Sequence, residues 1–547
     1  MVHGPFSAPS NPKLLRINVA LKHLLILLAF TLSENVLAQA PNITYNPSDI
    51  KVTQKIPFTI SPKNTGGAVP AVVYGQVTTL AGSTTGQRGF VDGIGTAALF
   101  NNSQDMAKDT AGNLYVADAT NNAIRRISPA GVVSTFAGSH VGVAGFTDGQ
   151  DTSARFNYPD GLAFDASGNL FVSDYNNFAI RKITPGGMVT TFFRDTTELF
   201  DPQALMFDSA GNLIFGLQYG NQVVKLSPSA VLTTIAGVNK LNGSADGVGT
   251  AALFSGPTDA RLDAAGNLIV ADSRNNEIRK IAPDGTVTTI AGSANAKVLY
   301  ANGPALAARF NYLTGVEMGP GGVVYIVDLL NNDIRLMMPD GTVSLLAGSP
   351  SQTAGNSDGI LTAAQFDEPC YLRIDKTGTG YIAEWGLGGA SRIRTIALAG
   401  YSLNGTLPLG LTFDSTTGTI SGTVGNAFTA RTDTVTAFNT SGFSTTIITF
   451  TYQELPADLV YCPNAFTPNG DGTNDVWKVR SETVRSIEFH IYDQWGELLF
   501  TSTSIDNGWD GTYKGHKEPV GVYVYYMDAV MNDGQNIKRK GTITLLK

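Results

Sequence analysis

The chain has 547 residues, of which 43% are hydrophobic and 15% charged, and it contains 60 glycines. This length exceeds what one hydrophobic core usually holds, so several domains are expected, and the composition favours short strands and tight turns over long solvated helices. Two cysteines exclude a disulfide framework, and a formal net charge of −8 disfavours nucleic acid or an anionic membrane as a partner.

Residues 1–38 are typical of a signal peptide. An apolar run from Leu24 to Leu32 follows a lysine, and Val36 and Ala38 supply the small residues for cleavage after Ala38. Removal of this leader, which carries a net charge of +2, leaves −10 on the mature chain. No later stretch approaches the roughly 18 apolar residues of a membrane helix. We therefore expect an exported chain with no transmembrane span.

Residues 71–398 repeat one motif six times, as in "GNLYVADATNNAIRRI" and "GNLIVADSRNNEIRKI". An acid ends the apolar run of five copies, namely Asp118, Asp174, Asp272, Asp328 and Glu384, and Leu217 takes its place in the third copy. We expect these acids to cap local backbone amides, and the Asp-Gly acids Asp92, Asp148, Asp246 and Asp358 to cap the short turns that follow them. The step is 55 or 56 residues, except for 43 between the second and third copies. This period suits four short strands, as in a propeller blade.

The two ends of the repeat region predict how it closes. The segment "GQVTTLAG" is a last blade strand with no strands before it, whereas the sixth copy stops after "SRIRTIA". We therefore predict six blades in which Gln76 to Ala81 pairs with Arg392 to Ile396, leaving no exposed sheet edge. The segment "YPDGLAFDASGNLFVSDYNNFAIRKITPGG" resembles an NHL repeat, and Val72 to Leu398 resembles a six-bladed NHL-type propeller. Such propellers include binding platforms and enzymes, so the fold alone does not give the activity.

The segments that flank the propeller predict a second domain. The stretch "YSLNGTLPLGLTFDSTTGTISGTV" within residues 399–454 resembles the Ig-like, He-PIG type of bacterial surface domain, and residues 41–70 resemble the first half of the same domain. We predict an all-β chain in which the propeller is inserted into an Ig-like sandwich, because closure of the ring brings its two ends together. The alternative is that residues 41–70 form a disordered linker.

Residues 455–547 predict a C-terminal β-sandwich. The stretches "CPNAFTPNGDGTNDVWKV", "IYDQWGELLF" and "PVGVYVYYMDA" resemble the gliding-motility-associated C-terminal domain. In that family the module is the type B sorting signal of the type IX secretion system of Bacteroidota. The resemblance implies the type IX secretion machinery as a partner, and delivery to the cell surface or the medium.

One turn of this last domain is a candidate metal site. The stretch "NGDGTND" brings together the oxygen-bearing residues Asn469, Asp471, Asn474 and Asp475. Carboxylate and amide oxygens suit calcium, but the spacing is not that of an EF-hand, and Asx turns account for these residues without a cation. Calcium therefore remains one of two interpretations, and no other cofactor is expected.

The innermost strands of the blades carry unusual charges. At their third position the six copies read Ala107, Ala163, Met206, Arg261, Glu317 and Arg373. Isolated charges near the central channel are costly, so Arg261, Glu317 and Arg373 either pair with one another, which we favour, or line a pocket for a polar ligand. We further expect one channel mouth to be ringed by Asn101, Asn157, Asp201, Ser255, Asn311 and Asp367.

These features favour a secreted or cell-surface binding protein whose propeller is a platform for an extracellular protein or glycan. Aromatic candidates for glycan contacts are Tyr175, Tyr219, Tyr312 and Trp385. The alternatives are an extracellular hydrolase or lyase acting at the channel, and an architectural surface component. Catalysis has less support, since the propeller has one histidine, His140, and shows no Ser-His-Asp set or phosphate-binding loop.

Overall fold

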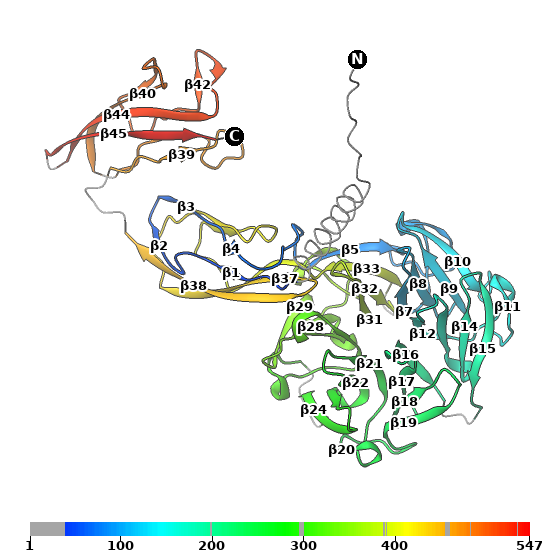
Figure 1. The fold of residues 1–547 in the computed structure, drawn as a ribbon. Coiled ribbons are helices and arrows are strands. Elements are labelled where there is room, and N and C mark those ends of the chain that lie inside the picture. The colour runs from blue at the N-terminus through cyan, green and yellow to red at the C-terminus, as the bar shows by residue number, and fades with distance from the viewer. Residues whose placement is uncertain are drawn as a thin grey trace, which may run out of the picture.

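The computed structural model describes residues 39–196, 200–294, 300–386, 389, 391–454, 460–481, 483–532 and 534–546. The predicted signal peptide lies outside these residues. Within them the regular elements are β-strands and single-turn 3₁₀ helices, arranged as a ring of blades, a sandwich beside it and a separate C-terminal domain (Figure 1). No helix in the described part of the chain is long and apolar enough to cross a membrane.

Six antiparallel sheets form the ring, as predicted. Their main strands are β7 (Ser103–Lys108), β8 (Leu114–Asp118), β9 (Ala123–Ile127) and β10 (Val132–Gly138) in blade 1; β12 (Pro159–Phe164), β13 (Leu170–Asp174), β14 (Ala179–Ile183) and β15 (Met188–Arg194) in blade 2; and β16 (Pro202–Phe207), β17 (Leu213–Leu217), β18 (Gln222–Leu226) and β19 (Leu232–Gly237) in blade 3. Blade 4 has β21 (Pro257–Leu262), β22 (Leu268–Asp272), β23 (Glu277–Ile281) and β24 (Thr286–Gly292), and blade 5 has β26 (Leu313–Met318), β27 (Val324–Asp328), β28 (Asp333–Met337) and β29 (Thr342–Gly348).

Blade 6 closes the ring with a strand from its far end. It contains β31 (Pro369–Ile374), β32 (Thr379–Glu384), β33 (Arg392–Ala397) and β5 (Gln76–Ala81). Strand β5 runs antiparallel to β33, with Thr78 opposite Thr395 and Val77 opposite Ile396. The six-bladed, closed arrangement is therefore confirmed.

A fifth, two-residue strand covers the outer edge of five blades. These strands are β6 (Gly93–Ile94), β11 (Gly149–Gln150), β20 (Gly247–Val248), β25 (Gly303–Pro304) and β30 (Gly359–Ile360). Each comes from the long connection that leads into the innermost strand of the blade it covers. The sheet of blade 3 has four strands, which matches the shortened repeat before it.

Segments on both sides of the propeller build one Ig-like sandwich. Its strands are β1 (Ile43–Thr44), β2 (Asp49–Thr53), β3 (Pro57–Ile60) and β4 (Lys63–Asn64), followed after the propeller by β34 (Gly400–Asn404), β35 (Leu411–Phe413), β36 (Ile420–Thr423), β37 (Arg431–Asn439) and β38 (Gly442–Gln453). Strand β2 pairs with β38, and β3 pairs with β36. The segment before the propeller is thus part of the sandwich, and the linker alternative does not describe it.

The sandwich packs on blades 5 and 6. Tyr74 stacks on Phe438 with ring centroids 4.7 Å apart, and both belong to a buried cluster that also contains Tyr325 and Leu398 of the propeller. Phe443 lies against Gly321, in the turn between β26 and β27, where φ is +71°. An added Cβ at Gly321 would meet the Phe443 ring at 3.1 Å, so glycine allows this close approach.

The C-terminal domain has its own core. A five-stranded sheet is formed by β39 (Ala465–Phe466), β45 (Asn536–Leu545), β44 (Gly521–Met531), β40 (Val484–Tyr492) and β41 (Leu498–Ser502), with a small hairpin of β42 (Thr512–Tyr513) and β43 (His516–Lys517) beside it. Trp477 and Trp509 are completely buried at its centre. Their backbones pair in an antiparallel bridge, and both indoles belong to the same buried cluster.

A buried ion pair recurs in the blades and explains much of the repeated motif. In blade 1, Arg125 is fully buried and donates to Asp118 at 2.8 Å and to Asp92 at 2.6 Å. Asp118 also accepts hydrogen bonds from the Asn101 amide and the Asn121 side chain. Equivalent arginines in four other blades are Arg181, Arg279, Arg335 and Arg394. Local capping by Asp118 is thus one part of a larger network.

The expected role of the Asp-Gly acids was wrong. Asp92 binds Arg125 and the backbone of Thr135, and the single-turn helix Gly95–Ala97 that follows has no side-chain cap. The fully buried guanidinium attracts this acid because an unpaired buried charge is far costlier than an uncapped surface turn.

In blade 3 the acid, the arginine and the first asparagine of this network are all replaced together. Leu217 replaces the acid, Val224 replaces the arginine and Gly220 replaces the first asparagine. Leu217 and Val224 lie instead in an apolar cluster with Phe200 and Phe215. Loss of one partner alone would leave a buried charge, whereas joint replacement by apolar residues is tolerated. The copy that looks degraded in the sequence is therefore a consistent apolar variant.

This reasoning predicts a non-additive pair of substitutions. Asp272→Leu leaves Arg279 without its buried partner and is expected to lower the free energy of unfolding by about 3–5 kcal/mol. Asp272→Leu combined with Arg279→Val copies blade 3, so it should regain at least half of that loss. Urea unfolding of the three proteins measures both values. A double variant that is as unstable as Asp272→Leu, or less stable, would contradict the all-or-none network.

Candidate functional site

The channel at the centre of the ring has two chemically different mouths. The innermost strands β7, β12, β16, β21, β26 and β31 line it. We call the end at the turns after β7, β26 and β31 the Ig-side mouth, because Gly321 and Gly378 in these turns contact the sandwich. The opposite end, at the loops that enter these strands, is the loop-side mouth.

The middle of the channel is closed, because apolar and polar side chains of the inner strands, among them Gln104, Thr258 and Tyr371, are buried there. Met106, Ala204, Leu329 and Tyr371, from blades 1, 3, 5 and 6, belong to one buried cluster. Cys370 joins them as a free thiol, with Sγ 3.2 Å from the Ser103 carbonyl oxygen, and burial raises the pKa of this thiol. The filled middle separates the two mouths.

The predicted charged residues form an ionic network on the Ig side of this layer. Arg261 Nε lies 3.5 Å from Glu317 Oε2, and Arg373 Nη1 lies 3.7 Å from the same oxygen. Shorter contacts go to two aspartates that the sequence analysis did not single out: Arg373 binds Asp105 at 2.7 Å and Asp259 at 3.0 Å. The two arginines and three carboxylates thus form ion pairs across blades 1, 4, 5 and 6.

Asp105 also joins blade 1 to blade 2, and Asp259 joins blade 4 to blade 5. Asp105 accepts a hydrogen bond from the Leu162 amide, and Asp259 accepts one from the Val316 amide. The sequence did carry a signal for them, because at this position other blades have glycine, alanine or tyrosine. Aspartate at this position in blades 1 and 4 departs from the residues of the other blades, and this difference could have been noticed in the sequence.

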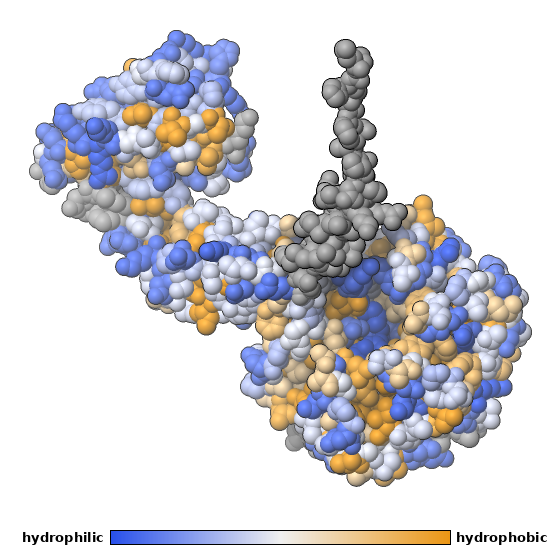
Figure 2. Space-filling view, viewed as in Figure 1, coloured by the Kyte–Doolittle hydropathy of each residue, from blue (hydrophilic) through white to orange (hydrophobic). Residues whose placement is uncertain are grey.

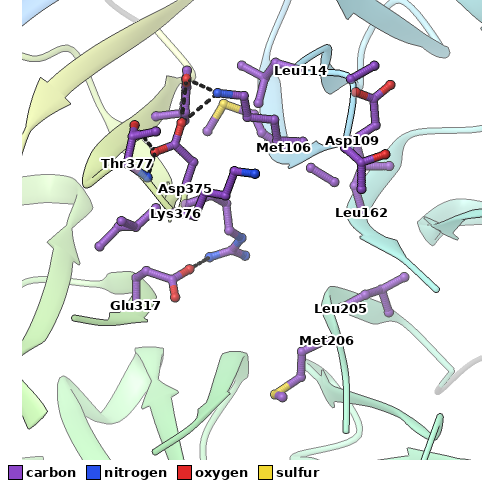
Figure 3. Close-up of a pocket in the computed structure, with 18 of the residues that line it drawn as sticks. Met106, Asp109, Leu114, Leu162, Leu205, Met206, Glu317, Asp375, Lys376 and Thr377 are labelled. Carbon is purple, nitrogen blue, oxygen red and sulfur yellow. Dashed lines mark hydrogen bonds and ion pairs between the residues drawn. The ribbon is translucent and has the colours of Figure 1, made fainter. Parts of the chain in front are cut away.

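The network borders a cavity of about 550 Å³ at the Ig-side mouth (Figure 3). Its aliphatic lining includes Met106, Leu162, Leu205 and Met206. At its rim Lys108 binds Asp375 at 2.6 Å and the Tyr381 hydroxyl at 2.7 Å. The charged residues therefore pair with one another and line a pocket, so the two interpretations of Arg261, Glu317 and Arg373 are compatible.

Another buried carboxyl, Asp160, lies toward the loop-side mouth. It is 4% exposed and accepts a long hydrogen bond, 3.4 Å, from the Tyr371 hydroxyl. Burial, and secondly the charge of Asp105, raise the pKa of Asp160 to about 8. This carboxyl is therefore largely protonated at neutral pH.

Aromatic side chains gather at the loop-side mouth, including those chosen from the sequence. Trp385 donates its indole N–H to Gln104, and Gln104 donates to the Tyr158 hydroxyl at 3.0 Å. The Tyr158 and Tyr175 rings lie 5.9 Å apart. On the other side of the mouth, Gln218 donates to the Tyr312 hydroxyl and Arg274 lies 4.6 Å from the ring of Tyr219, which is 53% exposed. Tyr158 is the member that sequence reasoning missed.

The repeated Asn-Asn turn fixes two of these tyrosines. Tyr158 and Tyr312 have φ of 60° and 57°, in the left-handed region that a bulky residue rarely adopts. Their amides donate to the side chains of Asn122 and Asn276, the second asparagines of the turns in the preceding blades. Strained backbone that surrounding contacts maintain is often found at binding sites.

The other sequence candidates are engaged in local hydrogen bonds. The backbone of Asn101, Asn157 and Asn311 bonds the turn after the second strand of the same blade, and Asp201 accepts from the Tyr219 amide. The Asp367 carbonyl oxygen accepts from the Gly386 amide. These residues lie in the loops that define the loop-side mouth.

The candidate calcium turn is held by its own hydrogen bonds. Asp475 accepts from the amides of Gly470 and Gly472, Asp471 accepts from the Thr473 amide, and Asn469 bonds Asp471. Among the residues described, no group of three or more His, Cys, Asp or Glu side chains could hold a metal ion. A calcium ion here stays a prediction.

Comparisons with known proteins agree with this architecture. Family models match for the CHU_C type IX secretion signal domain over residues 460–545, a putative Ig domain over 388–453 and an NHL repeat over 156–183. The chain thus combines an NHL propeller, an Ig-like domain and a type IX secretion signal domain. It is a secreted or cell-surface protein.

Individual relatives are distant. Protein SUPPRESSOR OF QUENCHING 1, chloroplastic, from Arabidopsis thaliana is 38% identical over 93 residues, which is 17% of this chain and 9% of the length of that protein. A structural genomics protein of unknown function from Bacteroides thetaiotaomicron is 19% identical, with a TM-score of 0.48 over 65% of this chain and 98% of that one. An auxiliary nutrient binding protein from the same organism is 15% identical, with a TM-score of 0.46 over 65% and 97%.

The raised pKa of Asp160 predicts a pH-dependent stability. Between about pH 4 and pH 8 the unfolded chain has lost this proton while the folded chain keeps it, so the free energy of unfolding falls as the pH rises. Asp160→Asn removes this titration and mimics the protonated carboxyl. Its stability relative to the unsubstituted protein should therefore rise with pH, by up to about 1.4 kcal/mol per pH unit. Parallel stability curves from urea unfolding at pH 5 to 9 would contradict the assignment.

Proposed function

We propose that this chain is a cell-surface or secreted glycan-binding protein, and that the loop-side mouth of the propeller is its binding site. The observation that carries this proposal is the group of aromatic rings and amide side chains around one mouth, formed by Tyr158, Tyr175, Tyr219, Tyr312 and Trp385 with Gln104 and Gln218. The secretion signal domain supports an extracellular ligand.

The chemistry of this mouth suits a saccharide. Aromatic faces offer apolar area for the C–H face of a sugar, and phenol, indole and amide groups offer hydrogen bonds at the rim. The side chains are also held in place before any ligand binds, since Gln104 links Trp385 to Tyr158 and Gln218 anchors Tyr312. Preorganised side chains lose little conformational entropy on binding.

The positions of the domains leave this mouth accessible. The sandwich contacts the ring at the turns of blades 5 and 6, on the opposite face, through Phe443 and Thr440. The Ig-like domain therefore does not cover the aromatic group. In this arrangement it positions the propeller, while the C-terminal domain serves export.

Substitution of two aromatic residues at this mouth, the exposed Tyr219 and the half-buried Trp385, tests the proposal. The chain without its leader is screened against a glycan array, and hits are measured by calorimetry. Tyr219→Ala and Trp385→Ala should each weaken binding about tenfold or more, equivalent to about 1.4 kcal/mol, because each removes an aromatic face. Trp495→Ala is the matched control, since Trp495 is 84% exposed on the C-terminal domain.

Three results would contradict the proposal. They are the absence of any glycan hit, equal weakening by Trp495→Ala, and capture of a protein through Tyr219 and Trp385 in place of a glycan. Thermal unfolding of each variant checks that the fold is retained.

A further inference from the structure

The cavity at the Ig-side mouth has a different chemistry from the aromatic mouth. Its volume of about 550 Å³ lies within the usual range for small-molecule sites, about 300–1,000 Å³. Leu162, Leu205 and Met206 form an aliphatic wall from blades 2 and 3, and Glu317 lies across the open space from them (Figure 3). The face in view in Figure 2 is hollowed at the centre of the ring, with apolar and polar residues both around the hollow.

The charged side of the cavity has unused hydrogen-bonding groups. Arg373 Nη2 is buried and has no hydrogen-bond partner, and among the described arginines no other terminal nitrogen is buried in this state. Its Nε and Nη1 are engaged by Asp105 and Asp259. The side chain is therefore fixed in place while one of its donors is left without a partner in the chain.

A weakly paired acceptor belongs to the same network as this donor. Glu317 Oε1 accepts from the Met318 amide, whereas Oε2 has ionic contacts at 3.5 Å and 3.7 Å, both longer than a good charge-assisted hydrogen bond. Both side chains keep a little exposure, 13% for Arg373 and 16% for Glu317. A ligand that enters the cavity can thus meet a guanidinium donor and a carboxylate acceptor together.

We propose that this cavity binds a small amphipathic zwitterion, of which an apolar α-amino acid is the simplest form. Its carboxylate accepts from Arg373 Nη2, its ammonium group donates to Glu317 Oε2, and its side chain packs on Leu205 and Met206. The site is separate from the glycan site, since the filled middle of the channel lies between the two mouths.

The charge of the ionic network and the chemistry of the cavity wall favour a zwitterion over other classes of ligand. Arg261 and Arg373 face the three carboxylates of Asp105, Asp259 and Glu317, so the ionised network carries a net charge of −1. A simple anion would bring a second negative charge beside Glu317, and a neutral ligand would leave one of the charged groups unpaired. A saccharide would find no free aromatic ring, since Tyr381 of the lining is engaged by Lys108.

Ligand analogues test the zwitterion directly. Calorimetry on the chain without its leader compares L-phenylalanine and L-leucine with N-acetyl-L-phenylalanine, which lacks the ammonium group, and L-phenylalaninamide, which lacks the carboxylate. We expect the free amino acids to bind and each blocked analogue to bind at least tenfold more weakly. Equal or tighter binding of the acetylated form, or no binding of either amino acid, would overturn the proposal.

Variants then place the ligand in this cavity. Met206→Trp fills the aliphatic side and should abolish amino acid binding, whereas Met206→Leu keeps the volume and should retain it. Glu317→Gln removes the carboxylate that faces the ammonium group, so phenylalanine should lose at least tenfold while the acetylated analogue is unchanged. Binding that persists in Met206→Trp, or an equal loss for both ligands in Glu317→Gln, would contradict the assignment.

Glycan binding serves as the independent readout. Because the aromatic mouth lies at the other end of the channel, the three variants should bind glycan as the unsubstituted protein does. Should the aromatic mouth bind no glycan at all, the amino acid measurements still decide this inference. If Met206→Trp lowers the melting temperature strongly, the comparison of ligands in Glu317→Gln decides it alone.

Discussion

The hydrogen-bonded pairing of β5 with β33 is the contact on which the rest of this molecule depends. A sheet edge left open at either end of the repeat region would expose unpaired backbone groups, and the pairing removes both edges at once. It also brings residues before and after the propeller together, so that β2 can pair with β38 and complete the sandwich. The shared buried cluster around Tyr74 and Phe438 then joins the two domains.

The repeated residues build the framework of the ring, and the residues that vary build its sites. In five blades an acid and a buried arginine form the same network, and asparagines in the turns bond the entry of the next blade. The ion pairs and hydrogen bonds of this framework are made within each blade and with its neighbour. The innermost strands and entry loops are therefore free to differ, and there the chain places its charges and its aromatic rings.

The filled channel gives the propeller two separate surfaces. Tyr371 and its apolar neighbours divide a mouth of aromatic and amide groups from a mouth of aliphatic and charged groups. The two surfaces offer different chemistry, because one presents aromatic rings and amide groups and the other an aliphatic wall beside paired charges. The Ig-like domain contacts the turns at the second mouth.

The architecture could be predicted from the sequence because its signals are local and repeated. Each signal can be read from short stretches of chain. These signals are the repeat period, the Asn-Asn turns, the unpaired last blade strand that begins at Gln76 and the motifs of the flanking domains. The charges of Arg261, Glu317 and Arg373 were likewise visible as departures from a uniform pattern. Their partners were not, because Asp259 lies 114 residues from Arg373, and the ring decides which blades face one another.

The same reason explains the other omissions. The buried arginine of five blades looks like an ordinary strand residue until the fold places it beside the acid that ends the second strand and, in four of these blades, a second acid from the connection before the blade. Tyr158 joins the aromatic group because the preceding blade holds its backbone in a left-handed conformation. The sequence by itself determined the modules, the number of blades and their closure. Only the tertiary structure decided which side chains meet, because those contacts join residues far apart along the chain.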